Sequence, residues 1–101
     1  MPSFLLFTTL STQGLQTLKA TPERLFEVNR EIEDLGGRVV RQWALIGPYD
    51  FLTVVEAESA AMVLDVASRF AARGSASIET LPAIPVDEFI VDLKAGGPLE
   101  G

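Results

Sequence analysis

Two short segments of this sequence carry apolar side chains on both of the faces that a strand would present. In the first segment, Phe4 and Leu6 would share one face, while Leu5 and Phe7 would share the other. Residues 51–57, FLTVVEA, are likewise apolar on both faces. Because side chains alternate across a strand, such segments are typical of the centre of a sheet that is covered on both sides. This double coverage is the strongest constraint that the sequence places on the fold.

Turn and capping residues divide the rest of the chain into helices and strands. Thr21 and Pro22 favour a helix start, because Thr can cap a helix and Pro suits its first turn. Gly36 and Gly74 favour helix ends, since glycine adopts a left-handed backbone without penalty. Ser59 is the predicted N-cap of the second helix. The predicted strands are residues 3–9, 38–46, 51–57 and 77–83, the predicted helices are residues 21–35, 59–73 and a short one within 86–93, and residues 10–20 are a connection.

The predicted elements follow the order strand, helix, strand, strand, helix, strand, which is the ferredoxin-like arrangement. The sequence therefore predicts an α+β fold, with a four-stranded antiparallel sheet and two helices on one of its faces. A chain of 101 residues is long enough for one domain, which we place at residues 1–94. Residues 95–101 contain three Gly and one Pro, and we expect them to form a flexible tail.

Two helices on one face leave the other face of the predicted sheet uncovered. Because the central strands are apolar on both faces, a large apolar patch would then lie in water, which monomers rarely allow. The simplest cover is a second copy of the sheet packed face to face, which predicts a homodimer and allows a higher oligomer. The segment around Phe89 and Ile90 would reach across and seal the partner. A monomer closed by this short segment alone is the alternative, but the segment is small for a four-stranded sheet.

Charge and composition exclude several classes of function. The chain carries eight Lys and Arg against fourteen Asp and Glu, a net charge of −6, so it has no basic surface for nucleic acid. It has no Cys and no His, which excludes disulfides, zinc fingers and His-dependent triads, and we expect no metal and no cofactor. The first residues lack the basic start and long apolar run of a signal peptide or a membrane span. We therefore expect a cytoplasmic protein without a membrane partner.

The turn Gly47-Pro48-Tyr49-Asp50, between two apolar strands, resembles the signature of the GYD-domain family. The stretches Ser11–Leu15, Gly36-Gly37 and Ile78–Leu81 also resemble this family, and the similarity covers residues 3–90. The resemblance implies a dimeric α+β barrel, in which two ferredoxin-like sheets face each other, and leaves the biochemical role undefined. The chain is more distantly similar to the effector-sensing domain of the Lrp/AsnC regulators, where a related hairpin lies near bound small effectors.

The predicted turn is the first candidate for a ligand site. Tyr49 offers a hydroxyl group on an aromatic ring, and Asp50 offers a carboxylate that accepts hydrogen bonds from an amine or a hydroxyl. Gly47 and Pro48 would form the turn itself. Turn formation alone is the competing interpretation and the stronger one, because Asp also bonds to nearby backbone N–H groups in ordinary turns.

Arg41 and Trp43 are the second candidate, because they share one face of the predicted second strand, together with Val39. The Arg41 guanidinium would hold a carboxylate or a phosphate, and the Trp43 indole would supply apolar area. The competing interpretation, again the stronger, places Trp43 in the core and Arg41 at its rim. The predicted ligand-binding residues are therefore Arg41, Trp43, Tyr49 and Asp50.

These residues predict a small-ligand-binding or sensory module that acts as a homodimer. One alternative is an enzyme that acts on a small substrate, similar to the cofactor-independent monooxygenases built on the same dimeric α+β barrel. Such an enzyme would use a polar group such as Asn29, although Asn is more often exposed to solvent. The other alternative is a purely structural dimerisation module. No catalytic constellation distinguishes among the three.

Overall fold

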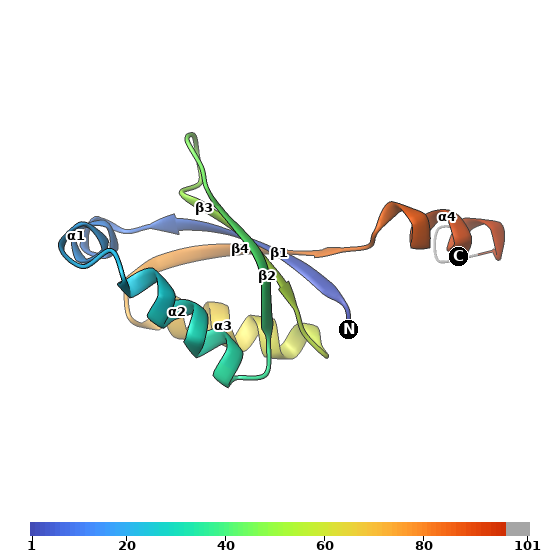
Figure 1. The fold of residues 1–101 in the computed structure, drawn as a ribbon, viewed down its shortest axis with the longest axis horizontal. Coiled ribbons are helices and arrows are strands. Elements are labelled where there is room, and N and C mark those ends of the chain that lie inside the picture. The colour runs from blue at the N-terminus through green and yellow to red at the C-terminus, as the bar shows by residue number, and fades with distance from the viewer. Residues whose placement is uncertain (97–101) are drawn as a thin grey trace.

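Four strands form a single antiparallel sheet in the order β2-β3-β1-β4, in a computed structural model that describes residues 1–96 (Figure 1). The elements are β1 (Ser3–Leu10), α1 (Thr12–Ala20), α2 (Arg24–Asp34), β2 (Arg38–Ala44), β3 (Phe51–Glu56), α3 (Ala60–Ala72), β4 (Ala76–Ala83) and α4 (Val86–Lys94). Helices α2 and α3 lie together on one face of the sheet (Figure 1). The predicted α+β, ferredoxin-like arrangement is confirmed.

The core lies between this helix pair and the sheet. Phe4 and Leu6 of β1 and Val55 of β3 point into it, and Leu6 and Val55 are each only 1% exposed. The helices close the core with side chains at helical spacing, which are Ile32 of α2 and Val63, Val66 and Phe70 of α3. The predicted central position of β1 and β3 follows directly, since each strand is bonded to a neighbour on both sides.

Three capping and turn predictions are confirmed by hydrogen bonds and backbone angles. The Ser59 hydroxyl caps α3 by accepting a hydrogen bond from the Met62 backbone N–H. Gly36 and Gly74 follow α2 and α3 with positive φ angles of 104° and 71°, where a side chain would be strained. Pro82 lies in β4, an edge strand, which is where a sheet tolerates proline.

The prediction that residues 10–20 form a connection is wrong, because Thr12–Ala20 is the helix α1. Its N-cap is Ser11, whose hydroxyl oxygen accepts a hydrogen bond from the Gly14 N–H at 3.0 Å. The same hydroxyl donates to the Gly74 carbonyl at 2.6 Å, so it also joins α1 to the end of α3. None of the α1 side chains is buried, which explains why the apolar pattern of this segment is weak.

The start of α2 and the face assignment of β2 also differ from prediction. Residues 21–23 form a turn, and α2 begins at Arg24 without a side-chain cap. Strand β2 has a β-bulge, since Val39 pairs with Val55 but Arg41 pairs with Val54. A bulge reverses the face on which later side chains lie. Val39 therefore packs against the core, whereas Arg41 and Trp43 do not share its face.

The last helix stands away from the rest of the chain (Figure 1). The radius of gyration is 15.3 Å, compared with about 13 Å for a compact domain of 100 residues. The predicted domain boundary at residue 94 stays a prediction, and most of the tail predicted at 95–101 lies outside the described residues. Within residues 1–96, no helix combines the length and the apolar character needed to span a membrane.

The contact between Gly14 and Ser75 leads to the first prediction. A Cβ atom at Gly14 would overlap the Ser75 backbone carbonyl, so α1 would have to move away from the start of β4. We expect Gly14→Ala to lower the free energy of unfolding by about 1–3 kcal/mol, the usual cost of overpacking. Urea unfolding measures this change. The control is Gln16→Ala in the exposed part of the same helix, and equal stability of Gly14→Ala and the parent chain would contradict the contact.

Candidate functional site

The face of the sheet opposite α2 and α3, here called the open sheet face, carries most of the chain's uncovered apolar strand residues. Strand pairing sets a row across the sheet, because Trp43 lies beside Leu52, Leu52 beside Phe7, and Phe7 beside Glu79. Trp43 is 46% exposed. The apolar residues of the open sheet face are Leu5, Phe7, Trp43, Leu52, Val54 and Leu81.

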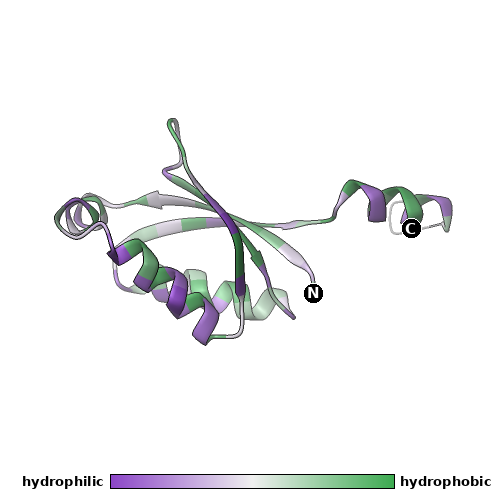
Figure 2. Ribbon diagram, in the orientation of Figure 1, coloured by the Kyte–Doolittle hydropathy of each residue, from purple (hydrophilic) through white to green (hydrophobic). Residues whose placement is uncertain are grey.

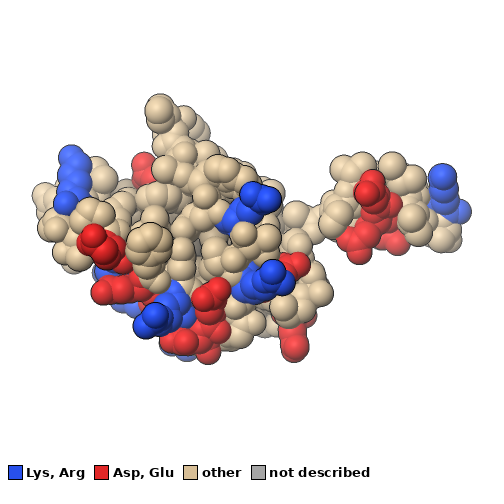
Figure 3. All heavy atoms as spheres, in the orientation of Figure 1, with Lys and Arg blue, Asp and Glu red and all other residues tan. Residues whose placement is uncertain are grey.

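Charged side chains border these apolar residues. Arg41 of β2 pairs with Val54 of β3. At one end of these two strands, Arg38 forms an ion pair with Glu56 at 3.4 Å. Glu79 lies at the β4 end of the row, beside Phe7. Figure 3 shows charged side chains over the helix layer, over the region of β2 and on α4, whereas the tip of the β2–β3 hairpin is uncharged. The open sheet face is thus an apolar strip with a polar rim.

Tyr49 folds back from the hairpin turn onto this same face. Its hydroxyl donates a hydrogen bond to Glu79 Oε2 at 2.5 Å, and its ring lies 4.9 Å from the Phe7 ring, centre to centre. The hydrogen bond to Glu79, with burial and the negative charge of Glu79 as smaller causes, raises the pKa of the Tyr49 phenol above its ordinary value. Tyr49 therefore stays protonated at neutral pH and presents a fixed aromatic ring.

Asp50, the next residue, bonds to the backbone of β1 and has a structural role. Its carboxylate accepts a hydrogen bond from the Leu10 N–H at 2.8 Å, and its own N–H donates to the Thr8 carbonyl at 2.8 Å. The Leu45 N–H closes the turn by donating to the Asp50 carbonyl, also at 2.8 Å. Gly47 adopts a φ of 140°, so the tip of the turn requires glycine. Asp50 thus fixes the hairpin to β1, as the turn interpretation predicts.

The structure therefore brings Arg41, Trp43 and Tyr49 to one face and leaves Asp50 outside that group. Trp43 is not a core residue, contrary to the interpretation that the sequence favoured, because the bulge in β2 turns it to the open sheet face. Arg41 and Trp43 lie two positions apart on β2, whereas Tyr49 contacts Phe7 of β1 and Glu79 of β4, so the three side chains do not converge on one point. Their assignment as ligand-binding residues stays a prediction.

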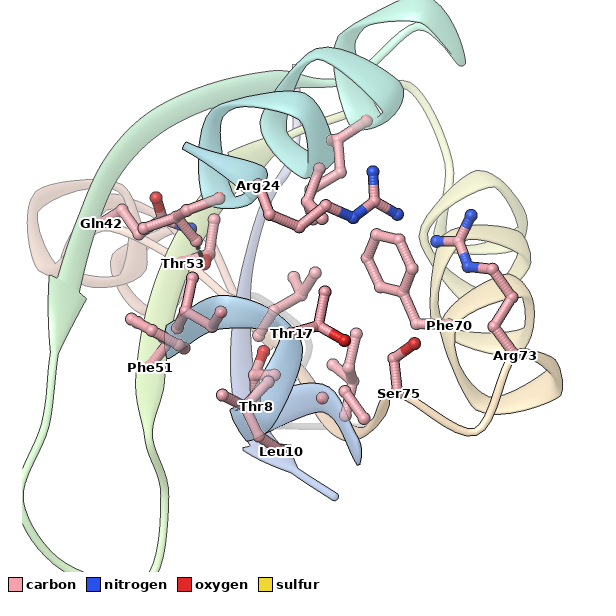
Figure 4. Close-up of a pocket in the computed structure, with 18 residues that line it drawn as sticks. Thr8, Leu10, Thr17, Arg24, Gln42, Phe51, Thr53, Phe70, Arg73 and Ser75 are labelled. Atoms are coloured by element: carbon pink, nitrogen blue, oxygen red, sulfur yellow. Dashed lines mark hydrogen bonds between the residues drawn. The ribbon is translucent and has the colours of Figure 1, made fainter. Parts of the chain in front are cut away.

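A small cavity of about 100 Å³ lies on the opposite side of the sheet, between it and the helices (Figure 4). Arg24, Phe70 and Arg73 lie along one wall, and Gln42 and Thr53 lie along the other (Figure 4). None of the four residues predicted to bind a ligand lines this cavity. Within residues 1–96, no group of three His, Cys, Asp or Glu side chains is placed to hold a metal ion.

Polar groups around the cavity are bonded to each other. The amides of Asn29 and Gln42 exchange two hydrogen bonds, at 2.8 and 3.1 Å, and Gln42 also donates to the Thr53 hydroxyl at 2.9 Å. The Arg73 guanidinium binds Glu31 through two nitrogens, at 2.9 and 3.1 Å. Asn29 is half-buried, although the sequence predicted it to be exposed. The bonds among Asn29, Gln42 and Thr53 join α2 to β2 and β3, and the bonds of Arg73 to Glu31 join the end of α3 to α2.

The fold and this surface together define an α+β protein of ferredoxin-like order with one apolar sheet face left open. A family model described as the GYD domain matches residues 4–91. This chain belongs to the GYD domain family, as its turn and strand motifs predicted.

Two proteins of Thermus thermophilus are similar to this chain. One is named "Glutamine synthetase and cystathionine beta-lyase binding protein" and is 52% identical over 95 residues, which cover 93% of this chain and all of the relative. The crystal structure of TTHA0845 is 20% identical, has a TM-score of 0.53, and is matched over 84% of this chain and 95% of that one. At this identity the second comparison supports the fold alone.

The first relative corrects the predicted function and the predicted partners. A protein that is 52% identical over its full length is named for binding two other proteins. The prediction of a small-ligand or sensory homodimer is therefore wrong, as are its two alternatives, an enzyme and a purely structural dimerisation module. The predicted partners, a second copy and a small molecule, are corrected by the same finding. No signal in the sequence distinguished a surface for other proteins from a surface for a second copy.

The contact between Tyr49 and Glu79 leads to a prediction about the pKa of Tyr49. Spectroscopy can measure this pKa, because Tyr49 is the single tyrosine of the chain. We expect its phenol to ionise above the ordinary value of about 10. Glu79→Ala removes the acceptor and its charge, so the pKa of Tyr49 should fall back toward that value. Titration of the tyrosinate absorbance measures the pKa in both proteins.

The raised pKa of Tyr49 also determines how the stability of the fold changes with pH. The contact stabilises the folded chain below a pH of about 10 and is lost as the phenol ionises at higher pH. Glu56→Ala, which removes a carboxylate elsewhere on the same face, is the control and should leave the pKa of Tyr49 unchanged. An unchanged Tyr49 titration in Glu79→Ala would contradict the hydrogen bond.

The bonds of Asp50 lead to a prediction on stability. Asp50→Ala leaves the Leu10 N–H without its partner, so we expect the free energy of unfolding to fall by about 1–3 kcal/mol. Asp50→Asn keeps an acceptor oxygen and should lose less. Both are measured by urea unfolding against Glu58→Ala, which removes an exposed carboxylate near the other end of β3. If Asp50→Ala is as stable as that control, Asp50 does not hold the hairpin.

Proposed function

We propose that this chain is a protein-binding protein whose partners are enzymes of the kinds named for its relative, glutamine synthetase and cystathionine beta-lyase. The observation that carries the proposal is the 52% identity to that relative, which extends over 93% of this chain and the whole of the relative. Identity at this level over the full length supports a common binding surface. With these partners, we infer a cytoplasmic location for the chain.

The open sheet face is the surface that we assign to this binding. Its apolar strip runs across all four strands, and Trp43 and Leu81 within it are 46% and 49% exposed. Patches of this kind mark interaction sites, since monomers rarely leave them in water. Because the apolar side chains form a strip across the strands and do not enclose a cavity, the surface suits another protein better than a small molecule.

The residue types on this face support the same assignment. Trp, Tyr and Arg are the residues most enriched at the energetic centres of protein interfaces, and the open sheet face holds Trp43, Tyr49 and Arg41. Tyr49 is already fixed by Phe7 and Glu79, so it loses little conformational freedom on binding. We propose that Trp43 and Tyr49 are the apolar anchors and that Arg41 pairs with a carboxylate at the rim of the interface.

The experiment measures binding of the purified chain to purified glutamine synthetase and cystathionine beta-lyase from the organism that encodes it. We expect the parent chain to bind at least one of them in surface plasmon resonance. Trp43→Ala should weaken this binding by about tenfold or more, as truncation of an interface anchor does. Leu64→Ala is the matched control, because Leu64 is an exposed apolar residue, 60% accessible, on α3 of the helix layer.

The outcomes separate the function from the surface. If the parent chain binds neither enzyme, the proposed function is wrong. If it binds and Trp43→Ala and Leu64→Ala both bind as the parent does, the function stands and the open sheet face is not the contact. Circular dichroism on each variant checks that the fold is retained.

A further inference from the structure

Helix α4 carries an apolar stripe that no other described element covers. Val86, Phe89, Ile90 and Leu93 are spaced at i, i+3, i+4 and i+7, so they lie along one side of the helix. Val86, Ile90 and Leu93 are exposed, with Val86 at 68% and Ile90 at 44%, whereas Phe89 is half-buried. Figure 2 shows that apolar and polar residues alternate along α4, and Figure 1 shows the helix apart from the sheet and the other helices.

The chain before α4 directs the helix outward. Pro85 is extended, with φ −54° and ψ 139°, so the link after β4 is stiff. A hollow separates α4 from Met1–Ser3, and its α4 lining consists of Asp87, Glu88, Val91 and Asp92, none of which belongs to the stripe. The apolar stripe therefore points away from the N-terminal residues of its own chain.

A helix in this position needs a surface to pack on. α4 has nine residues, whereas isolated helices shorter than about 12–15 residues are marginal in water. Most helices in proteins gain their stability from packing of the apolar side. Because α4 makes no extensive contact with the other described elements, its apolar stripe is available to a second molecule.

The charges of α4 indicate what kind of surface that molecule presents. Asp87 precedes Ile90 by three positions and Asp92 follows Phe89 by three, so a carboxylate borders the stripe on each side. Figure 3 shows acidic side chains together on α4 and a basic side chain at its end, where the last turn carries Lys94. A second copy of this chain has the same net charge of −6, so long-range electrostatics disfavour its approach. Charge complementarity favours a partner with lysine or arginine beside an apolar groove.

We propose that α4 is a docking helix, which lays its stripe into an apolar groove with a basic rim on the partner enzyme. Recognition of an amphipathic helix in a groove uses the spacing found here. This inference rests on the proposed function and adds a second contact to the one at the open sheet face. Two contacts from one chain would bind the enzyme more tightly than either contact alone, because formation of the first contact raises the effective concentration of the second binding surface.

The test compares two truncations on opposite sides of the helix in the full chain. Ile90→Ala shortens the stripe, and Val91→Ala removes a similar apolar group, 64% exposed, from the other side. Binding to purified glutamine synthetase and cystathionine beta-lyase is measured for both by surface plasmon resonance. We expect Ile90→Ala to weaken binding by about tenfold and Val91→Ala to bind as the parent chain does.

A charge variant tests the basic rim separately. The double substitution Asp87→Asn with Asp92→Asn should slow association and reduce its dependence on salt, because long-range attraction is screened by ions. Asp34→Asn, an exposed acid at the end of α2, is the control and should leave the association rate unchanged. Association rates that are equal in the double variant and in this control would overturn the basic rim.

The outcomes distinguish the docking helix from the proposed function. If the parent chain binds an enzyme and Ile90→Ala binds equally well, the docking helix is overturned and the function remains. If the parent chain binds neither enzyme, both are overturned. If sedimentation shows a parent dimer that Ile90→Ala converts to a monomer, α4 covers a second copy, which also overturns the proposal.

Discussion

The structure depends on the fact that its central strand, β1, is apolar on both faces. One face supplies Phe4 and Leu6 to the core beneath the two helices, and Leu6 is almost completely buried. The other face supplies Leu5 and Phe7 to the open sheet face. Since a two-helix layer covers only one side of a sheet, the same eight residues that build the core also create a surface that favours a partner. The buried core and the open sheet face thus share one strand.

The hairpin turn contributes both to the stability of the fold and to the open sheet face. Asp50 points to β1 and joins the turn to Leu10 and Thr8, whereas Tyr49 points across the open face to Glu79. Both residues lie in the turn between β2 and β3, outside the strands, so their side chains need not alternate as in a strand, and one residue of the pair holds the fold while its neighbour lies on the open sheet face. The GYD signature is therefore part structural anchor and part surface.

Much of the fold could be predicted because its signals are local. Apolar alternation marks β1 and β3, and Ser59 and Gly74 bracket α3 with an N-cap and a left-handed end. Helix α1 was missed because its position depends on Gly14 approaching Ser75, more than sixty positions along the chain. The bulge in β2 has no signature in the alternation, and it moved Trp43 from the predicted core to the open face. For the site, the sequence predicted Arg41, Trp43, Tyr49 and Asp50, and the first three lie on the open sheet face whereas Asp50 bonds to β1.

The sequence by itself determined the order of the elements, the two apolar faces of the central strands and the amphipathic spacing of α4, because each follows from the fixed periods of strands and helices. Only the tertiary structure decided which of those faces is covered. That choice depends on contacts between distant segments, such as Asp50 with Leu10 and Gln42 with Asn29 and Thr53. Such contacts form when the chain closes its core, so the open sheet face and the outward position of α4 are properties of the folded molecule.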